Sequence, residues 1–232
     1  MNVTNNFIQK FITSREIESK RESCLMIALT DARKLAGRDI ASGEIKNNLL
    51  ISAGCDVALT PYSLIGLINY LLVLEMIGEI FKTSRPIDGF NQPKDNKIYK
   101  ALKQFSPLPL CDKDIYVIIS LRNSLAHNYG LINIPKCKKE KEEIEDLTKL
   151  HKFTLNNLDT AELIVYPELK LKRDEIFSNK SNDTSTIIGY IKMVELIESV
   201  YEKLKAELIE GNVELALKDG LDELKARFTL RN

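Results

Sequence analysis

The chain has 232 residues, and its 33 Lys plus Arg balance 33 Asp plus Glu, so the formal net charge is zero. A balanced charge excludes a protein that attracts nucleic acid through a global basic field, and any such contact must come from a local patch. Hydrophobic residues make up 44% and charged residues 28%, which is ordinary for a globular protein. The length predicts a single domain over residues 1–232.

The four cysteines are scattered: Cys24, Cys55, Cys111 and Cys137 form no C-x-x-C pair, and neither of the two histidines lies beside one. This spacing argues against a structural zinc site. Scattered cysteines are typical of buried thiols in a reducing compartment. Residues 1–10 lack the apolar core of a secretory signal, so the sequence predicts a cytoplasmic protein.

Two long helices are expected in the first third of the chain. Residues 6–36 have apolar side chains at helical spacing, and Gly37 is a natural stop. Residues 62–81 are mostly apolar, with Thr60 and Pro61 as the expected helix start.

The second of these segments is long enough to be taken for a membrane span. It contains Asn69, Glu75 and Glu79, and an acidic residue at the centre of a membrane helix is costly. We therefore expect a central helix of a soluble bundle, with no membrane partner.

A short helix is expected over residues 95–105, followed by a break at 106–109 and a longer helix over 112–127. The longer helix carries an apolar stripe that should face the core, and residues 128–130 end it. The stripe consists of Ile115, Ile118, Ile119, Leu121 and Leu125.

Residues 136–185 are predicted to be an insertion. They begin with the charge run KCKKEKEEIE, in which Lys136, Lys138 and Lys139 are candidate RNA contacts. The alternative is a solvated loop whose glutamates cancel these lysines. Residues 152–156 and 162–166 predict a small β-hairpin.

Two C-terminal helices are expected over 186–210 and 213–228, separated by Gly211. Together these elements predict a mainly α fold, an up-and-down helical bundle with a small β-hairpin insertion.

The most informative segment is residues 121–130, LRNSLAHNYG. Arg122 can hold a phosphate in a forked, bidentate manner, and His127 can take and give a proton near neutral pH. Asn123 lies four residues before His127, on the same face of a helix. Arg122 could bind the phosphate of a phosphodiester, Asn123 could hydrogen-bond to it, and His127 could transfer a proton during its cleavage.

The same segment resembles the Arg-x4-His motif of HEPN-domain ribonucleases. His127, Asn128 and Tyr129 are also similar to the His-x-Tyr of HEPN toxins paired with minimal-nucleotidyltransferase antitoxins. The resemblance implies a HEPN-like helical bundle, a homodimer with a composite site, RNA as substrate, and Tyr129 as the residue that a nucleotidyltransferase-type antitoxin would modify. The alternative for Tyr129 is a helix-terminal ring with its hydroxyl in water.

Two further residues are candidates for supporting the site. Ser124 lies inside the motif, and Glu75 is a carboxylate on an apolar helix that needs a partner such as Arg122. The alternative is that Glu75 and Glu79 lie on the exposed stripe of their helix. We expect Glu75 to lie closer to Arg122 than Glu79 does.

These features predict a metal-independent endoribonuclease that leaves 2′,3′-cyclic phosphate ends, and the resemblance to HEPN ribonucleases implies a role in prokaryotic defence or toxin–antitoxin regulation. RNA supplies its own nucleophile, the 2′-OH, and the sequence has no Walker loop, G-x-G-x-x-G or clustered metal ligands, so no cofactor is expected. The first alternative is a non-catalytic HEPN-like module that binds a nucleotide or a protein. The second is a helical scaffold in which the motif is accidental.

Overall fold

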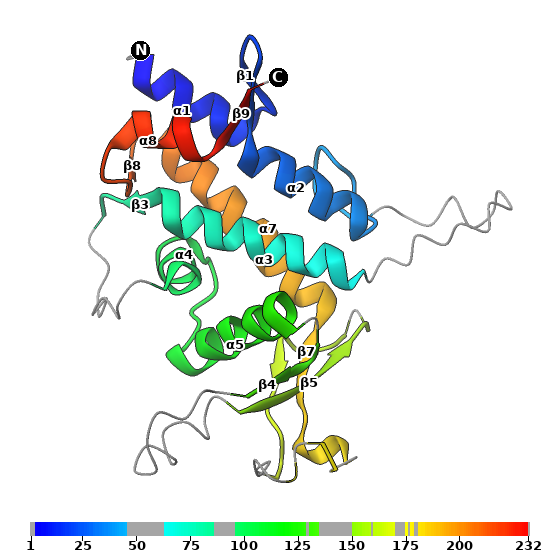
Figure 1. The fold of residues 1–232 in the computed structure, drawn as a ribbon. Helices are drawn as coiled ribbons and strands as arrows, with labels where there is room; N and C mark the ends of the chain where they lie inside the picture. The colour runs from blue at the N-terminus through cyan, green and yellow to red at the C-terminus, as the bar shows by residue number, and fades with distance from the viewer. Residues whose placement is uncertain are drawn as a thin grey trace, which may run out of the picture. The chain divides into compact units, whose positions relative to one another are not determined.

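A computed structural model of the chain describes residues 3–45, 63–85, 96–128, 130–134, 150–158, 160–169, 175, 177–178 and 181–231. The chain forms two compact units (Figure 1). The first unit combines Met1–Pro109 with Leu196–Asn232, and the second unit is Leu110–Glu195. Helix α7 (Tyr190–Ile209) contributes its first residues to the second unit and the remainder to the first.

The first unit is built mainly of helices that enclose an apolar interior. Its buried side chains include Phe11, Leu29, Leu74, Phe105 and Leu204. Besides the end of α7, its elements are α1 (Val3–Thr13), β1 (Glu16–Glu18), β2 (Arg21–Ser23), α2 (Cys24–Leu35), α3 (Leu64–Ile80), β3 (Phe81–Thr83), α4 (Lys97–Phe105), β8 (Val213–Leu215), α8 (Gly220–Arg227) and β9 (Thr229–Arg231).

Two small sheets join distant parts of the chain within the first unit. Strand β2 pairs with β1 on one side and with β9 on the other, and all the pairs are antiparallel. The last strand of the described chain therefore lies beside residues 21–23 (Figure 1). Strand β3 pairs antiparallel with β8, which fixes the end of α3 beside the segment that follows α7.

The expected helix over residues 6–36 is interrupted. The β1–β2 hairpin separates α1 from α2, and Lys20 takes a positive φ of 63° in its turn. Ser23 then caps α2, because its hydroxyl accepts the Met26 N–H at 3.2 Å and donates to the Phe11 carbonyl at 2.7 Å. Ile17, whose position also fits the helical spacing of residues 6–36, is instead buried as part of strand β1.

Helix α3 is the central helix that the apolar segment predicted. It starts at the cap residue Ser63, whose hydroxyl accepts the Gly66 N–H, and its chain turns into β3 after Ile80. Thr60 and Pro61, the expected start, lie outside the described residues. No helix in the described part of the chain is long and apolar enough to cross a membrane. A Cβ at Gly78 would lie 1.8 Å from the Lys97 carbonyl oxygen, so α3 and α4 require glycine there to approach closely.

A buried ion pair lies in the interior of the first unit. Arg33 of α2 is 2% exposed, and its Nε and Nη2 donate to the two carboxylate oxygens of Glu198 of α7 at 2.9 and 2.6 Å. The Arg33 Nη1 donates to the carbonyls of Ile40 and Ala41 at 2.9 and 3.0 Å. Burial alone would lower the pKa of Arg33, but the hydrogen bonds and charge of Glu198 outweigh it and raise that pKa.

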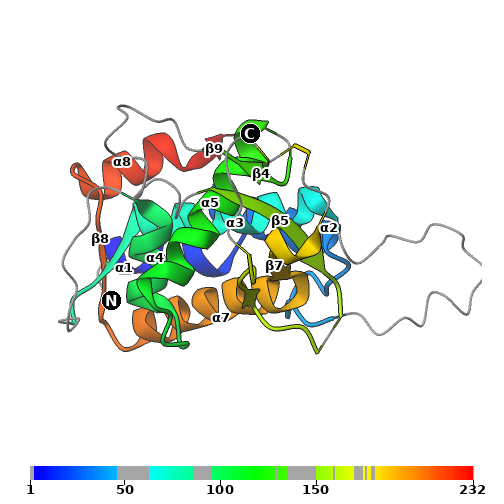
Figure 2. The same ribbon diagram turned by 90° about the horizontal axis from the view of Figure 1, so that it is seen from below.

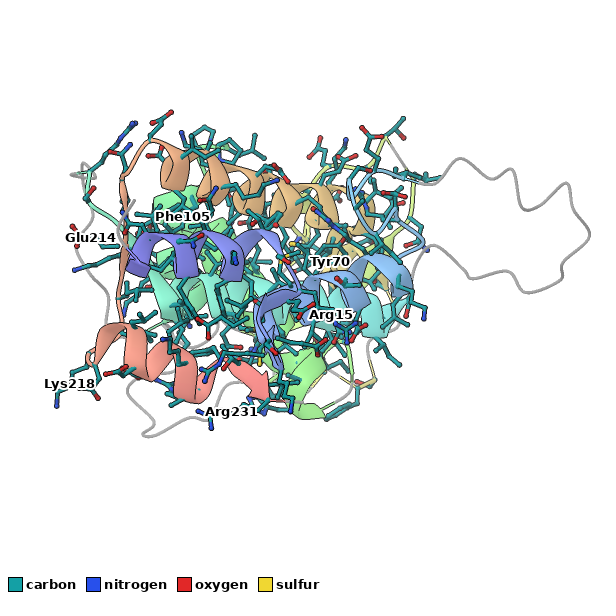
Figure 3. The ribbon with its side chains drawn as sticks, turned by 90° about the horizontal axis from the view of Figure 1, so that it is seen from above. Arg15, Tyr70, Phe105, Glu214, Lys218 and Arg231 are labelled. Atoms are coloured by element: carbon teal, nitrogen blue, oxygen red, sulfur yellow. The ribbon has the colours of Figure 1, made fainter. Side chains whose placement is uncertain are left out.

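Tyr70 of α3 completes this cluster. It is fully buried among the helices, whereas Lys218 and Arg231 lie at the outside of the same unit (Figure 3). Its hydroxyl donates to Glu198 Oε1 at 2.6 Å. Burial and the nearby negative charge of Glu198 raise the pKa of the Tyr70 hydroxyl, so it remains a donor. Three helices of the first unit therefore meet at one carboxylate.

The second unit contains a four-stranded sheet. The order is β4-β5-β7-β6, with β5 and β7 parallel and the other pairs antiparallel. Helix α5 lies against β4 and β5 (Figures 1 and 2). The elements are α5 (Asp112–Asn128), β4 (Ile132–Asn133), β5 (His151–Asn156), β6 (Ile164–Val165), the short 3-10 helix η5 (Asn182–Thr184) and β7 (Thr186–Gly189).

This sheet corrects two expectations. The strands of the predicted hairpin exist as β5 and β6, but β7 lies between them, so they do not pair. The segment from Thr186, expected to be helical, forms β7 before α7 begins. In the first unit, residues 213–215 form β8, which pairs with β3, rather than the expected helix.

The predicted fold class is also wrong. Across the described ranges the chain has seven α-helices and nine strands in three sheets, which is a mixed α/β fold rather than a mainly α bundle. Most of the strands are two to four residues long, and such short segments carry little periodicity of their own. Apart from the β1–β2 hairpin, their pairing partners lie far away in the sequence, where local patterns give no signal.

Removing one partner of the buried pair should be costly. Glu198→Gln leaves the Arg33 charge without its counter-ion, and we expect the free energy of unfolding to fall by about 3–5 kcal/mol. The matched control is Glu202→Gln on the same helix, which breaks an exposed pair with Lys205 and should cost no more than about 1 kcal/mol. Urea denaturation measures both, and equal stabilities would contradict the assigned role of the buried pair.

Candidate active site

Helix α5 starts at a capping arrangement. The Cys111 carbonyl accepts the Ile115 N–H at 3.2 Å, and the Asp114 carboxylate accepts hydrogen bonds from the Cys111 backbone and from its thiol, the latter at 3.0 Å. A carboxylate that reaches back from the third helical position satisfies an N–H that the helix itself cannot. The negative charges of Asp112 and Asp114 also interact favourably with the positive end of the helix dipole. The sequence therefore specifies this start locally.

A second residue stabilises the same helix start from the sheet. The Tyr166 hydroxyl donates to Asp114 Oδ1 at 2.6 Å, and the Lys113 ammonium lies 3.4 Å from the centre of the Tyr166 ring. Burial would raise the pKa of Asp114, but the hydrogen bonds from Tyr166 and Cys111 outweigh it and lower that pKa. The sequence carries no local signal of this contact, because Tyr166 lies 52 residues from Asp114.

The middle of α5 is anchored in the core. All the members of the predicted apolar stripe are buried, as are the intervening Val117 and Ser120. The stripe is therefore confirmed, and the helix that carries the motif is a fixed element. Its members are Ile115, Ile118, Ile119, Leu121 and Leu125.

Ser124 closes the other end of the helix. Its fully buried hydroxyl donates to the Gly130 carbonyl at 2.7 Å, and the Gly130 N–H lies 3.4 Å from the Ser124 carbonyl. These bonds hold the chain where it leaves α5 and turns toward β4. Ser124 therefore fixes this helix end, with its hydroxyl turned away from solvent, and its expected support of the site stays a prediction.

Arg122 and His127 meet at the surface end of the helix. The Arg122 Nη1 lies 3.1 Å from His127 Nε2 and 3.4 Å from the Asn123 Oδ1. Arg122 and Asn123 are half-buried, and His127 is exposed. The structure thus brings together the three residues expected to be catalytic, at a solvent-accessible position on a rigid helix.

The carboxylates of α3 belong to the first unit. Glu79 pairs with Lys97 at 3.1 Å and with Arg227 at 2.8 Å. Burial would raise the pKa of Glu79, but the hydrogen bonds from Arg227 and Lys97 outweigh it and lower that pKa. Glu75 is half-buried, and its pairing with Arg122, which belongs to the second unit, stays a prediction.

Several expected site residues lie outside the described part of the chain. They are the candidate modification site and the candidate RNA contacts, namely Tyr129, Lys136, Lys138 and Lys139. Within the described residues, no group of three or more His, Cys, Asp or Glu is placed to hold a metal ion.

The second histidine, His151, is buried, whereas His127 is exposed. His151 is buried in β5, its Nδ1 lies 3.0 Å from the Thr186 hydroxyl, and its ring stacks on Phe153 at 5.2 Å between centroids. The sequence signal for this role was the alternation of His151 and Phe153 with Lys152 and Thr154, which places the two rings on one face of the strand. His151 is therefore a core residue, and its replacement should disturb packing.

A scan against protein-family models and searches of curated proteins and of solved structures find no match for this chain. The likeness to HEPN ribonucleases therefore stands on the motif residues themselves.

The bond between Tyr166 and Asp114 gives a pH-dependent prediction. The folded pKa of Asp114 lies below its ordinary 3.8, so its carboxylate adds stability above that pH and loses it as the pH falls through the folded value. Tyr166→Phe should lower the free energy of unfolding at pH 7 by about 1 kcal/mol. This value is small because solvent screens a pair that is partly exposed. The difference should shrink in acid.

Urea denaturation across this pH range tests the prediction. In an Asp114→Asn background the Tyr166→Phe change should lose its pH dependence. A difference between Tyr166→Phe and wild type that is the same in acid as at neutral pH would contradict the assignment.

Proposed function

We propose that this protein is a metal-independent endoribonuclease of HEPN type. The observation that carries the proposal is the 3.1 Å contact between Arg122 Nη1 and His127 Nε2 at an accessible helix end. It supports a site in which a phosphate-binding cation and a proton-transferring group act on the same bond. The mixed α/β fold differs from the helical bundle that the motif resemblance implies, so the proposal is about the chemistry of the site.

Each motif residue has a distinct role in this proposal. His127 moves the proton of the 2′-OH that attacks phosphorus. Arg122 neutralises the charge that grows on the phosphoryl oxygens in the transition state. Asn123, with its carbonyl oxygen 3.4 Å from Arg122 Nη1, helps to orient the guanidinium. None of these roles requires a metal ion.

The biological setting is proposed from the motif resemblance. A two-fold homodimer would place two copies of the Arg122–His127 pair at one composite site. Such an enzyme would act in the cytoplasm, in prokaryotic defence or toxin–antitoxin regulation, with a nucleotidyltransferase-type antitoxin that modifies Tyr129. Static light scattering at micromolar concentration should give the dimer mass, and a monomer would argue against a composite site.

Cleavage of a single-stranded oligoribonucleotide in EDTA tests the proposed function. Wild type should leave 2′,3′-cyclic phosphate ends and should leave the matching 2′-deoxy oligonucleotide intact. His127→Ala should lose about 10²- to 10⁴-fold in rate, as expected for general acid–base catalysis. Arg122→Ala should lose a similar factor through the missing phosphate contact.

Arg15→Ala is the matched control for the arginine, because Arg15 is 57% exposed and forms a surface ion pair with Glu22. It should cut RNA at the wild-type rate. The ribonuclease proposal fails if His127→Ala cuts as fast as wild type, or if cleavage requires added Mg²⁺. RNA binding without cleavage would favour the alternative, a non-catalytic module.

A further inference from the structure

The contact between Arg122 and His127 fixes which nitrogen of the imidazole carries a proton. A guanidinium has five N–H donors and no acceptor, and it stays charged at any physiological pH. The Arg122 Nη1 lies 3.1 Å from His127 Nε2, which is hydrogen-bonding distance. This contact is a hydrogen bond only if Nε2 accepts, and a neutral imidazole that accepts at Nε2 carries its proton on Nδ1.

We infer that Arg122 and His127 form a resting pair in the free protein and that the phosphate of a phosphodiester separates them. In the resting pair the lone pair of Nε2 is occupied by Arg122. When phosphate oxygens bind the guanidinium, Nε2 is released and can accept a proton. The inference rests on the proposed function for the identity of the substrate and specifies how that substrate activates the site.

The relative strengths of the two hydrogen bonds favour this exchange. In a guanidinium–phosphate pair both partners are ionised, whereas in the resting pair only the donor is charged. A phosphodiester also offers two non-bridging oxygens, which share its negative charge and match the fork of Arg122, whereas His127 offers one nitrogen. His127 is exposed and Arg122 is half-buried, so a phosphate in solution can reach the pair. A neutral ligand has no comparable advantage.

The exchange also assigns the reacting atom. Because Nε2 faces the guanidinium in the resting pair, it lies beside the phosphate once Arg122 binds that group. The 2′-OH proton then moves to Nε2, the 2′-oxygen bonds to phosphorus and the P–O5′ bond breaks. Nε2 then gives this proton to the departing 5′-oxygen. The step therefore needs no other reactant, and the imidazole returns to its neutral form.

Nitrogen NMR of the histidine rings tests the inference without any cleavage. The chain has only two histidines, and the spectrum of His127→Ala identifies the ring of interest. At neutral pH free wild type should show His127 protonated on Nδ1 and unprotonated on Nε2. Arg122→Met removes the donor, and its His127 ring should shift to the ordinary mixture of tautomers. His151, bonded to Thr186, should not change and is the internal control.

A 2′-deoxydinucleoside monophosphate serves as the uncleavable probe. Its addition should shift the Nε2 resonance of His127 in wild type and leave that of Arg122→Met unchanged. Wild type with the proton on Nε2, or a tautomer unaffected by Arg122→Met, would overturn the resting pair. Binding of the probe that leaves Nε2 unmoved would overturn the exchange. A correct tautomer in a protein that cuts no RNA would instead reject the proposed function and leave the resting pair intact.

Discussion

The buried charge of Arg33 is the constraint around which the first unit is organised. A guanidinium that is 2% exposed needs a counter-ion and partners for its donors. The counter-ion is Glu198, 165 residues further along the chain, and the remaining donor binds the carbonyls that follow α2. Tyr70 adds the third helix by donating to the same carboxylate. This one network therefore fixes α2, α3 and α7 together.

The network also restricts the loop that follows α2. Arg38 is buried and donates to the Gly43 carbonyl at 2.7 Å. Gly43 has a φ of +75°, and a Cβ there would lie 2.6 Å from a carboxylate oxygen of Glu198. Any larger residue would both strain the backbone and press on the ion pair. The sequence does not predict this cluster, because Arg33 and Glu198 are 165 residues apart and form no local pattern.

The second unit supports its site in a different way. Helix α5 is held at its start by Asp114 with Cys111 and Tyr166, and at its end by Ser124 with Gly130. Arg122, Asn123 and His127 lie between these fixed points, on the part of the helix that solvent can reach. Functional side chains on a helix fixed at both ends are held more precisely than side chains on a loop. The close contact of Arg122 with His127 follows from that placement.

Features that depend on residues close together in the sequence could be predicted, and features that depend on distant residues could not. The start and apolar stripe of α5, the short helix α4 and the Arg122–His127 pair depend on residues a few positions apart, and these predictions agree with the structure. The β5–β7 pairing and the β2–β9 pairing depend on residues 33 or more positions apart. Of these four strands only β5 was predicted, because the segments of β2 and β7 have helical spacing and β9 has no signal of its own. The predicted helix over 6–36 failed because Ser23 acts as a cap inside an otherwise regular pattern.

A double-mutant cycle in single-turnover RNA cleavage tests the central claim most directly. Arg122→Ala, His127→Ala and the double variant are compared with wild type at saturating enzyme. If the two residues act as one unit on the same step, the double variant should be about as slow as the slower single variant, because effects within a unit are not additive. Rate losses that multiply in the double variant, or single variants that cut like wild type, would contradict the claim that this pair is the catalytic site.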